Sequence, residues 1–344
     1  MQHVYIKTYY KVLCLVLGLS ALTSIGYAQD LHFSQFQHAA VLLSPTETGN
    51  YFGDWRVINN YRNQWAKIGR PITTAAVAFD RQIYFNNQKF SFGGQYVYDE
   101  GGDYLLVHQK FLLAAAYHQT VGHNTFRIGV QGGVVQKRLN SGGYSLPDQW
   151  DQQTGRFNSN LPTGEQLYRR IIYYPDFNIG ASYRTKIWKL KPEATLSLFH
   201  INRPNESFFY EENKLKIRKA IFIRSLIKIN KQWTLDPQFL YMWQNKSIDF
   251  VIGSYANYRL SSNFLKAQYA FAGISLRNSL IRNWDAFIFT GGLQFNRLRA
   301  AISYDVTVSQ LRLANSYSGA VEVALIYTGF SSVLGKRAIP CNRL

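Results

Sequence analysis

Seven histidines give this chain its main means for acid–base or metal chemistry at neutral pH. None lies in an H-x-x-x-H or H-E-x-x-H motif, and the chain has neither a Gly-x-Ser-x-Gly elbow nor a phosphate-binding loop. His118 and His123 flank a turn predicted at Val121–Gly122. A rim hydrolase site and an ordinary interfacial histidine both account for them. The sequence predicts no enzyme, cofactor or metal site.

The elements that would position such residues show a period of two. In the stretch 298–309, Ile302 and Tyr304 fall on one parity, whereas Arg299, Ser303 and Asp305 fall on the other. Successive side chains of a strand point to opposite faces, so the stretch predicts a β-strand with one apolar and one polar face. By itself, this strand fits a soluble sandwich as well as a membrane barrel.

The same alternation recurs along the chain. Phe126, Ile128 and Val130 alternate with Arg127 and Gln131. We predict fourteen strands, an even number as in single-chain bacterial barrels. Their expected ranges are 52–65, 71–85, 89–99, 103–119, 124–137, 172–186, 188–201, 217–229, 232–246, 248–260, 266–278, 284–296, 298–309 and 317–329.

Composition decides between a soluble and a membrane protein. After the N-terminal 28 residues, no apolar run is long enough for a transmembrane helix, yet aromatic residues form 16% of the chain, with 24 Tyr and 23 Phe. Aromatic girdles and one-sided apolar strands are typical of outer-membrane barrels. We therefore predict an all-β, up-and-down antiparallel barrel at 51–330, with outer-membrane lipid against its apolar face and a C-terminal tail at 331–344.

The N-terminus carries targeting features. Lys7 and Lys11 precede the apolar run Val12–Leu22, and small residues end at Ala28. This order predicts a signal peptide at 1–28, cleaved after Ala28, and export to the cell outer membrane. The remaining chain would keep one cysteine, Cys341, and therefore no internal disulfide.

The charge balance is strongly basic. Removing Lys7 and Lys11 from 38 basic residues leaves 36 against 20 acidic residues, a net charge of +16. Such an excess suits nucleic acid, anionic head groups or an acidic partner. Export argues against nucleic acid, and basic residues scattered over loop ends and a lumen remain the simple alternative.

The segment 29–50 lacks sustained alternation, so it is a candidate for work outside the barrel wall. We predict a plug folded into the lumen or a periplasmic segment; a disordered leader is the alternative. Its contact candidates are Phe33, Ser34, Gln35, Phe36 and Pro45. Arg62 and Gln64 share the polar parity of the first strand, so Arg62 could anchor this segment or pair with an acid on a neighbouring strand.

Two interruptions are longer than ordinary turns. Residues 138–170 are polar and turn-rich, and residues 202–216 combine Phe208 and Phe209 with Glu211 and Glu212. Long barrel loops usually face the cell exterior. The second loop is either a partner-docking surface or a loop packed on itself.

Three groups of short stretches complete the picture, in this order: Gln29–Phe36, Leu43–Pro45, Gly49 and Tyr61–Trp65; Phe199–Pro204, Ser207–Phe208 and Leu240–Tyr241; Ser303–Val306, Ser309, Leu311, Gly319 and Glu322. Together they resemble the PorP/SprF family of type IX secretion membrane proteins. Departures are Ser44-Pro45-Thr46 where Asn-Pro-Ala is usual, Thr307 where Asn is usual, and the ending Cys341-Asn342-Arg343-Leu344.

The resemblance implies an outer-membrane barrel of the type IX secretion and gliding machinery that is not an enzyme. It implies partnership with periplasmic lipoprotein and ring components, or with a secreted adhesin that bears a C-terminal secretion domain. A passive porin and a membrane hydrolase remain as alternative functions. Only the secretion hypothesis accounts for the order of the matched stretches.

Overall fold

The computed structural model describes residues 30–86, 88–101, 106–139, 147–158, 160–161, 169–260, 267–279 and 283–331. The chain divides into two units, Met1–Asp30 and Leu31–Leu344, and all described helices and strands belong to the second. The predicted signal peptide at 1–28 lies outside the described residues. So does the predicted tail at 331–344, except for Ser331.

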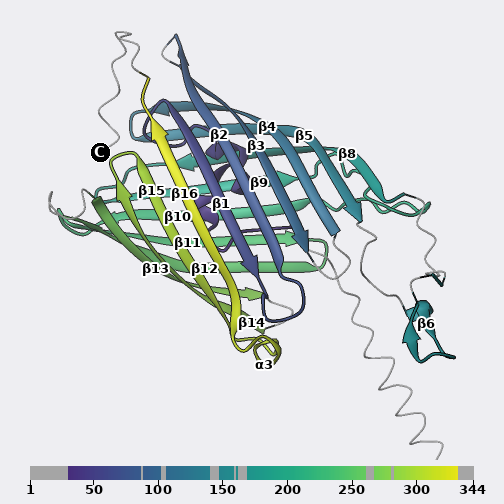
Figure 1. Ribbon diagram of the computed structural model, residues 1–344. Helices are drawn as coiled ribbons and strands as arrows, with labels where there is room; N and C mark the ends of the chain where they lie inside the picture. Colours follow the sequence, from purple (N-terminus) through teal and green to yellow (C-terminus); the bar gives the residue numbers. More distant parts are fainter. Residues whose placement is uncertain are drawn as a thin grey trace, which may run out of the picture. The chain divides into compact units, whose positions relative to one another are not determined.

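Within the described residues, fourteen antiparallel strands close into a barrel in which each strand pairs with its neighbours in the chain and β1 pairs with β16 (Figure 1). This is the predicted fold, and every predicted strand overlaps an observed one. The strands are β1 (Trp55–Gln64), β2 (Ile72–Phe85), β3 (Gln88–Gly101), β4 (Leu106–Val121), β5 (Asn124–Leu139), β8 (Ile171–Arg184), β9 (Leu190–Phe199), β10 (Arg218–Lys228), β11 (Trp233–Gln244), β12 (Ser247–Arg259), β13 (Ala267–Ser279), β14 (Asn283–Phe295), β15 (Leu298–Thr307) and β16 (Ser318–Gly329).

Side-chain alternation sorts the strands into an outer apolar face and an inner polar face. In β15, Ile302 is 58% exposed on the outside, whereas Asp305 is fully buried on the inside. A charge on the lipid face near the bilayer midplane would cost about 2–4 kcal/mol, which explains the consistent parity. Among the described residues, no helix is both long and apolar enough to cross a membrane.

The two ends of the barrel differ in their connections. The long ones, 140–170 between β5 and β8 and 200–217 between β9 and β10, share one end, which we call the long-loop end. The first contains a small hairpin of β6 (Trp150–Asp151) and β7 (Arg156–Phe157). The opposite, short-turn end has tight turns such as 122–123 and 296–297. Because long barrel loops face outward and short turns face the periplasm, we assign the ends accordingly.

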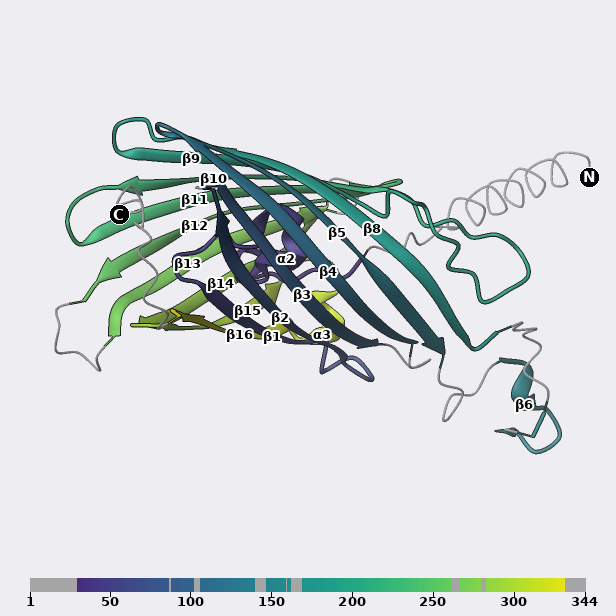
Figure 2. The same cartoon turned by 90° about the horizontal axis from the view of Figure 1, so that it is seen from above.

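Residues 31–50, the lumen segment, lie inside the ring of strands, where Figure 2 shows α2. The segment contains the 3-10 helices η1 (Phe36–His38) and η2 (Pro45–Glu47) and the short helix α2 (Ala40–Leu43). Ser44 begins η2 by accepting a hydrogen bond from Thr46 N–H at 3.2 Å, and Pro45 suits the first helical position. Most of the segment is buried.

Candidate functional site: the segment held in the barrel lumen

At its N-terminal end, the lumen segment is held through its backbone N–H groups. Ser34 N–H and Gln35 N–H donate to the two carboxylate oxygens of Glu322 on β16, at 2.7 and 2.8 Å. Arg62 on β1 forms an ion pair with the same carboxylate and donates from Nη1 to Ser34 Oγ at 2.7 Å. All four residues are buried. We call Ser34, Gln35, Arg62, Asp305 and Glu322 the upper clamp.

The hydroxyl of Ser34 joins further charges to this clamp. It donates to Asp305 Oδ2 on β15 at 2.6 Å and accepts from Arg277 Nη1 on β13 at 2.8 Å. Arg277 also lies 3.1 Å from Asp305 and 2.7 Å from Asp285. Buried charges are tolerated when they are paired and hydrogen-bonded, so the segment completes a network that β1, β13, β15 and β16 build around it.

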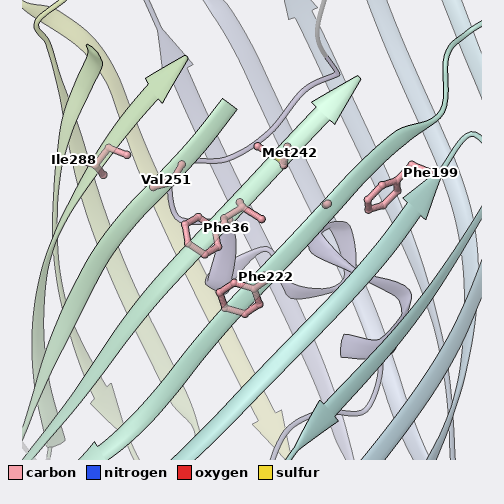
Figure 3. Close-up of a cluster of buried hydrophobic side chains, with 8 residues drawn as sticks. Phe36, Phe199, Phe222, Met242, Val251 and Ile288 are labelled. Atoms are coloured by element: carbon pink, nitrogen blue, oxygen red, sulfur yellow. The ribbon is translucent and has the colours of Figure 1, made fainter. Parts of the chain in front are cut away.

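Phe36 occupies an apolar socket in the inner wall of the barrel (Figure 3). Its ring meets Phe222 edge-to-face, with ring centroids 5.5 Å apart. The socket consists of Phe199, Ala220, Phe222, Leu240, Met242, Val251 and Ile288. A cavity of about 30 Å³ lies beside it, lined in part by Leu31, Phe33 and Leu43. The wall is thus apolar where the segment presents apolar side chains.

His38 holds the next turn of the segment through a chain of hydrogen bonds, which we call the relay, from Arg299 to Glu322. Arg299 Nε on β15 donates to His38 Nε2 at 3.1 Å, so this ring nitrogen is the acceptor and Nδ1 carries the proton. His38 Nδ1 lies 2.9 Å from Gln35 Oε1, and Gln35 Nε2 donates to the Glu322 carbonyl at 3.2 Å. Burial, reinforced by Arg299 and Arg224, holds the pKa of His38 well below 6.5. The relay therefore requires a neutral imidazole.

Two facing glycines make room for Ser44-Pro45-Thr46. Gly129 of β5 and Gly180 of β8 are partners in the sheet register. A Cβ on Gly129 would lie 2.5 Å from the carbonyl carbon of Pro45, and one on Gly180 would lie 2.8 Å from Ser44 Oγ. Backbone cannot yield easily at such distances, so the absence of side chains here permits the close approach of η2 to the wall.

At its C-terminal end, the segment is held mainly through its carbonyls. Arg56 Nη2 donates to Glu47 O at 3.0 Å, His118 Nε2 contacts Thr48 O at 2.9 Å, and Lys89 Nζ donates to Gly49 O at 2.5 Å. Gly49 N–H donates to Asp80 Oδ2 at 2.7 Å, and Asp80 pairs with Arg56. We call Glu47, Thr48, Gly49, Arg56, Asp80, Lys89 and His118 the lower clamp.

The two histidines considered for hydrolysis, His118 and His123, have different surroundings. His118 faces inward from β4 and contacts Thr48 O, a contact that gives it a role in the lower clamp. His123 is exposed in the turn between β4 and β5. A third histidine, His200, is buried 2.8 Å from Asp176 beside the long-loop end. Among the described residues, no group of three or more His, Cys, Asp or Glu side chains is arranged to hold a metal.

The structure gathers most of the sequence-predicted contact residues. Phe33, Ser34, Gln35, Phe36 and Pro45 are buried in the lumen, and Arg62 reaches them from the wall. Gln64 contacts Arg62 Nε through its side-chain oxygen at 3.2 Å.

Phe208 and Phe209 lie elsewhere, in the loop between β9 and β10. Phe208 packs with Leu215 against Val135, Ile172 and Tyr174 on the inner wall near the long-loop end. Phe209 is 47% exposed, and its neighbour Tyr210 is 81% exposed. Phe208 thus packs the loop against the barrel, whereas Phe209 and Tyr210 are exposed to solvent.

The sequence reasoning missed the wall residues of the lower clamp and the glycine pair. A signal was present for the charged ones, because Arg56, Asp80 and Lys89 share the inward parity of their strands. Gly129 and Gly180 gave no such signal. Their use depends on a pairing register between β5 and β8 across a long insertion.

Comparisons with known proteins agree with this architecture. The chain is similar to the CymD monoaromatic hydrocarbon channel, with a TM-score of 0.51 and 10% identity over 89% of this chain and 95% of that one. For the Ralstonia pickettii toluene transporter TbuX, the TM-score is 0.49, with 11% identity over 85% of this chain and 94% of that one. At 10% identity, the likeness to CymD concerns the fold alone. No curated protein matches the sequence.

A family model provides the identification. The model described as type IX secretion system membrane protein PorP/SprF matches residues 25–327. The match covers the lumen segment and all of β1 to β15, together with nearly all of β16. With its closed fourteen-strand barrel, this chain is an outer-membrane protein that belongs to the PorP/SprF family of the type IX secretion system.

Proposed function

We propose that this barrel anchors or receives a secreted adhesin, or the C-terminal secretion domain of such a cargo, at the outer membrane. It would do so without catalysing a reaction, together with the periplasmic lipoprotein and ring components of the secretion and gliding machinery. Family membership sets the system in which the barrel works. The cargo role is our inference.

The occupied lumen is the observation that carries this proposal. The lumen segment contacts the wall from Ser34 near the long-loop end to Gly49 near the short-turn end, and buried ion pairs hold both clamps. A passive pore needs a continuous aqueous path, whereas a docking scaffold does not. The occupied lumen therefore favours work through the rims and the ends of the barrel.

The loop between β9 and β10 is the best surface for such docking at the cell exterior. Tyr210, Glu211 and Glu212 are exposed there, while Phe208 ties the loop to the wall. Exposed aromatic side chains supply contact area at low entropic cost. This loop could therefore present one face to an exported partner without unfolding.

Surface display of cargo tests the proposal directly. We expect that deleting the gene abolishes surface exposure of an adhesin, measured by protease accessibility on intact cells, and that the wild-type gene restores it. A Tyr210→Ser, Phe209→Ser double variant should reduce display while the barrel still assembles. A double variant of the β6–β7 hairpin, Trp150→Ser with Phe157→Ser, is the matched control. Unchanged display of every exported adhesin in the deletion strain would refute the role.

Conductance separates the scaffold from the porin alternative. We expect the purified barrel in planar bilayers to show little steady current, because the clamps keep the lumen segment in place. A Glu322→Ala variant, which frees the upper clamp, should conduct more. A large steady current through the wild-type protein would favour the passive porin instead.

A further inference from the structure

Two neighbouring turns at the short-turn end carry a dense group of cations around one tryptophan. The turns are 185–189, between β8 and β9, and 229–232, between β10 and β11, and Lys228 N–H donates to Lys189 O at 3.2 Å (Figure 2). Six residues in these turns and at the adjoining strand ends form what we call the basic patch: Lys186, Trp188, Lys189, Lys191, Lys228 and Lys231.

The patch has no counter-charge of its own. Residues 184–191 and 228–233 include no Asp or Glu. The nearest acid in the chain, Glu193, is buried in an ion pair with Arg127. Within the described residues, none of the five lysines forms an ion pair. A cluster of like charges raises the energy of the isolated protein unless an anionic partner or counter-ions neutralise it.

Trp188 supplies a second, independent observation. Ile187 and Leu190 exchange backbone hydrogen bonds of 2.9 Å in both directions, so Trp188 and Lys189 form a two-residue turn. Trp188 has φ +52° in a turn position that favours glycine, and its side chain is 82% exposed. Lys189 Nζ lies 4.9 Å from the centre of the Trp188 ring, so the recorded contact of this exposed indole is with a cation of the patch and not with the barrel wall. Strained backbone is often concentrated at ligand clamps and other functional sites, so the conformation of Trp188 is consistent with a binding role.

We infer that the basic patch docks an acidic protein surface in the periplasm, with the Trp188 indole entering an apolar recess between the partner's carboxylates. Charge complementarity across such contacts steers association and fixes orientation, and tryptophan is a frequent anchor of interfaces. The inference rests on the periplasmic partnership proposed above and assigns a surface to it. It is separate from the cargo role, which concerns the opposite end of the barrel.

The distribution of charge argues for a protein partner over phospholipid head groups. A lipid-binding belt would follow the rim all round. The turns Asn86–Asn87 and Gly122–His123 at the same end contain no Lys or Arg, and the connections 260–266 and 296–297 contain one basic residue each. The two adjacent turns 185–189 and 229–232 together contain three lysines, and two more lie at the adjoining strand ends. One localised and strongly charged surface fits a partner with a defined footprint.

A defined probe tests the charge and the indole separately. The barrel in phosphatidylcholine nanodiscs should bind a short fluorescein-labelled peptide of alternating Glu and Tyr, measured by anisotropy, but not the same peptide with Gln for Glu. The Lys186→Gln, Lys189→Gln, Lys231→Gln variant should bind roughly tenfold more weakly. The matched control is Lys67→Gln with Arg70→Gln, in the β1–β2 connection at the long-loop end. Equal binding by the wild type and the patch variant would overturn the inference.

The Trp188→Gly variant shows whether the indole binds a partner or stabilises the fold. Glycine relieves the left-handed backbone, so this variant should be at least as stable as the wild type in urea unfolding, yet it should bind the acidic peptide more weakly. A less stable variant with unchanged binding would assign Trp188 a structural role and overturn its part in docking.

Photo-crosslinking in intact cells identifies the class of partner. A benzoylphenylalanine residue in place of Trp188 should yield a protein adduct with an acidic partner, and the adduct should disappear in the triple lysine variant. The same residue in place of His123, in another turn at this end, is the control. No protein adduct at position 188, combined with peptide binding that appears only in phosphatidylglycerol nanodiscs, would assign the patch to lipid and refute a protein partner.

Discussion

At the upper clamp, the wall presents a carboxylate to backbone N–H groups, whereas at the lower clamp it presents mainly cations to backbone carbonyls. Glu322 accepts from Ser34 and Gln35, while Arg56 and Lys89 donate to Glu47 and Gly49. Both clamps therefore recognise main-chain atoms of the lumen segment. Side-chain identity matters at Ser34, whose hydroxyl joins the charges of the upper clamp, and between the clamps, at Phe36 and beside the glycine pair.

The difference also predicts how each clamp fails. The upper clamp contains several mutually paired buried charges, so losing one leaves the others without compensation. In the lower clamp, Arg56 and Asp80 form a buried ion pair. Lys89 and His118, on separate strands, each hold one backbone carbonyl, so losing either removes one hydrogen bond to the segment. We expect failure to be abrupt at the upper clamp and gradual at the lower one.

Glu322→Ala should have the largest effect. It leaves Arg62 without its nearest carboxylate and frees two backbone donors, for an expected loss of about 3–5 kcal/mol in stability. Urea unfolding in lipid, followed by tryptophan fluorescence, measures this. Hydrogen exchange of residues 31–38 should rise more than that of residues 44–49. A loss similar to that of a surface control such as Lys67→Ala would contradict the network.

Gly129→Val tests the cradle between the clamps. The added Cβ meets the Pro45 backbone, so η2 has to move away from β5. We expect this movement to lower the free energy of unfolding by about 1–3 kcal/mol. Hydrogen exchange at residues 44–49 should increase. Gly291→Val is the matched control, since a Cβ at Gly291 meets nothing within 4 Å. Equal effects of both substitutions would indicate a general cost of strand glycine replacement.

Lys89→Met should produce a smaller and local change. Removing the ammonium takes away the hydrogen bond that Lys89 donates to Gly49 O, which should lower the free energy of unfolding by about 1–2 kcal/mol. Arg56 and His118 continue to hold the neighbouring carbonyls. Conductance should stay close to that of the wild type. If Lys89→Met opened the pore as widely as Glu322→Ala, the contrast between the clamps would be wrong.

Acidification should give the smallest effect. Because the pKa of His38 is lowered in the folded protein, the unfolded chain takes up a proton first as the pH falls below 6.5. Stability contributed by His38 is thus present above pH 6.5 and is lost as the pH falls toward the lowered value. Protonated His38 would point a second donor at Arg299 Nε, beside Gln35 and Tyr255. A His38→Gln variant should lose part of the pH dependence of hydrogen exchange at residues 34–38; an unchanged dependence would exclude His38 as its source.

Local alternation in the sequence, together with the aromatic-rich composition, was enough to predict the barrel. In β15, charge is excluded from the face toward lipid and tolerated on the face toward the lumen. Residues such as Ile302 and Asp305 therefore show which positions face lipid, even when the neighbouring strands are not known. Tyr304 and Ser303 repeat the same rule one residue pair along the strand. Strand ends differed by only a few residues, since turns interrupt the alternation there.

The site was only partly predictable. Phe36, Ser34 and Arg62 stood out because an unpaired segment precedes a strand with an inward arginine. The partners Glu322 and Asp305 lie far along the chain, at separations of 288 and 271 residues from Ser34. No local pattern encodes such a distance.

The sequence by itself determined the alternating strands, the barrel they close into and the family to which they belong, because a membrane allows charge on one face only. Tertiary structure alone decided that residues 31–50 lie in the lumen and that Gly129 meets Gly180 beneath Pro45. It also decided that the turn after Lys228 lies beside the turn of Trp188. Closure of the sheet is the reason. It brings strands that are remote in the sequence around one axis and sets the neighbours of every inward and rim residue.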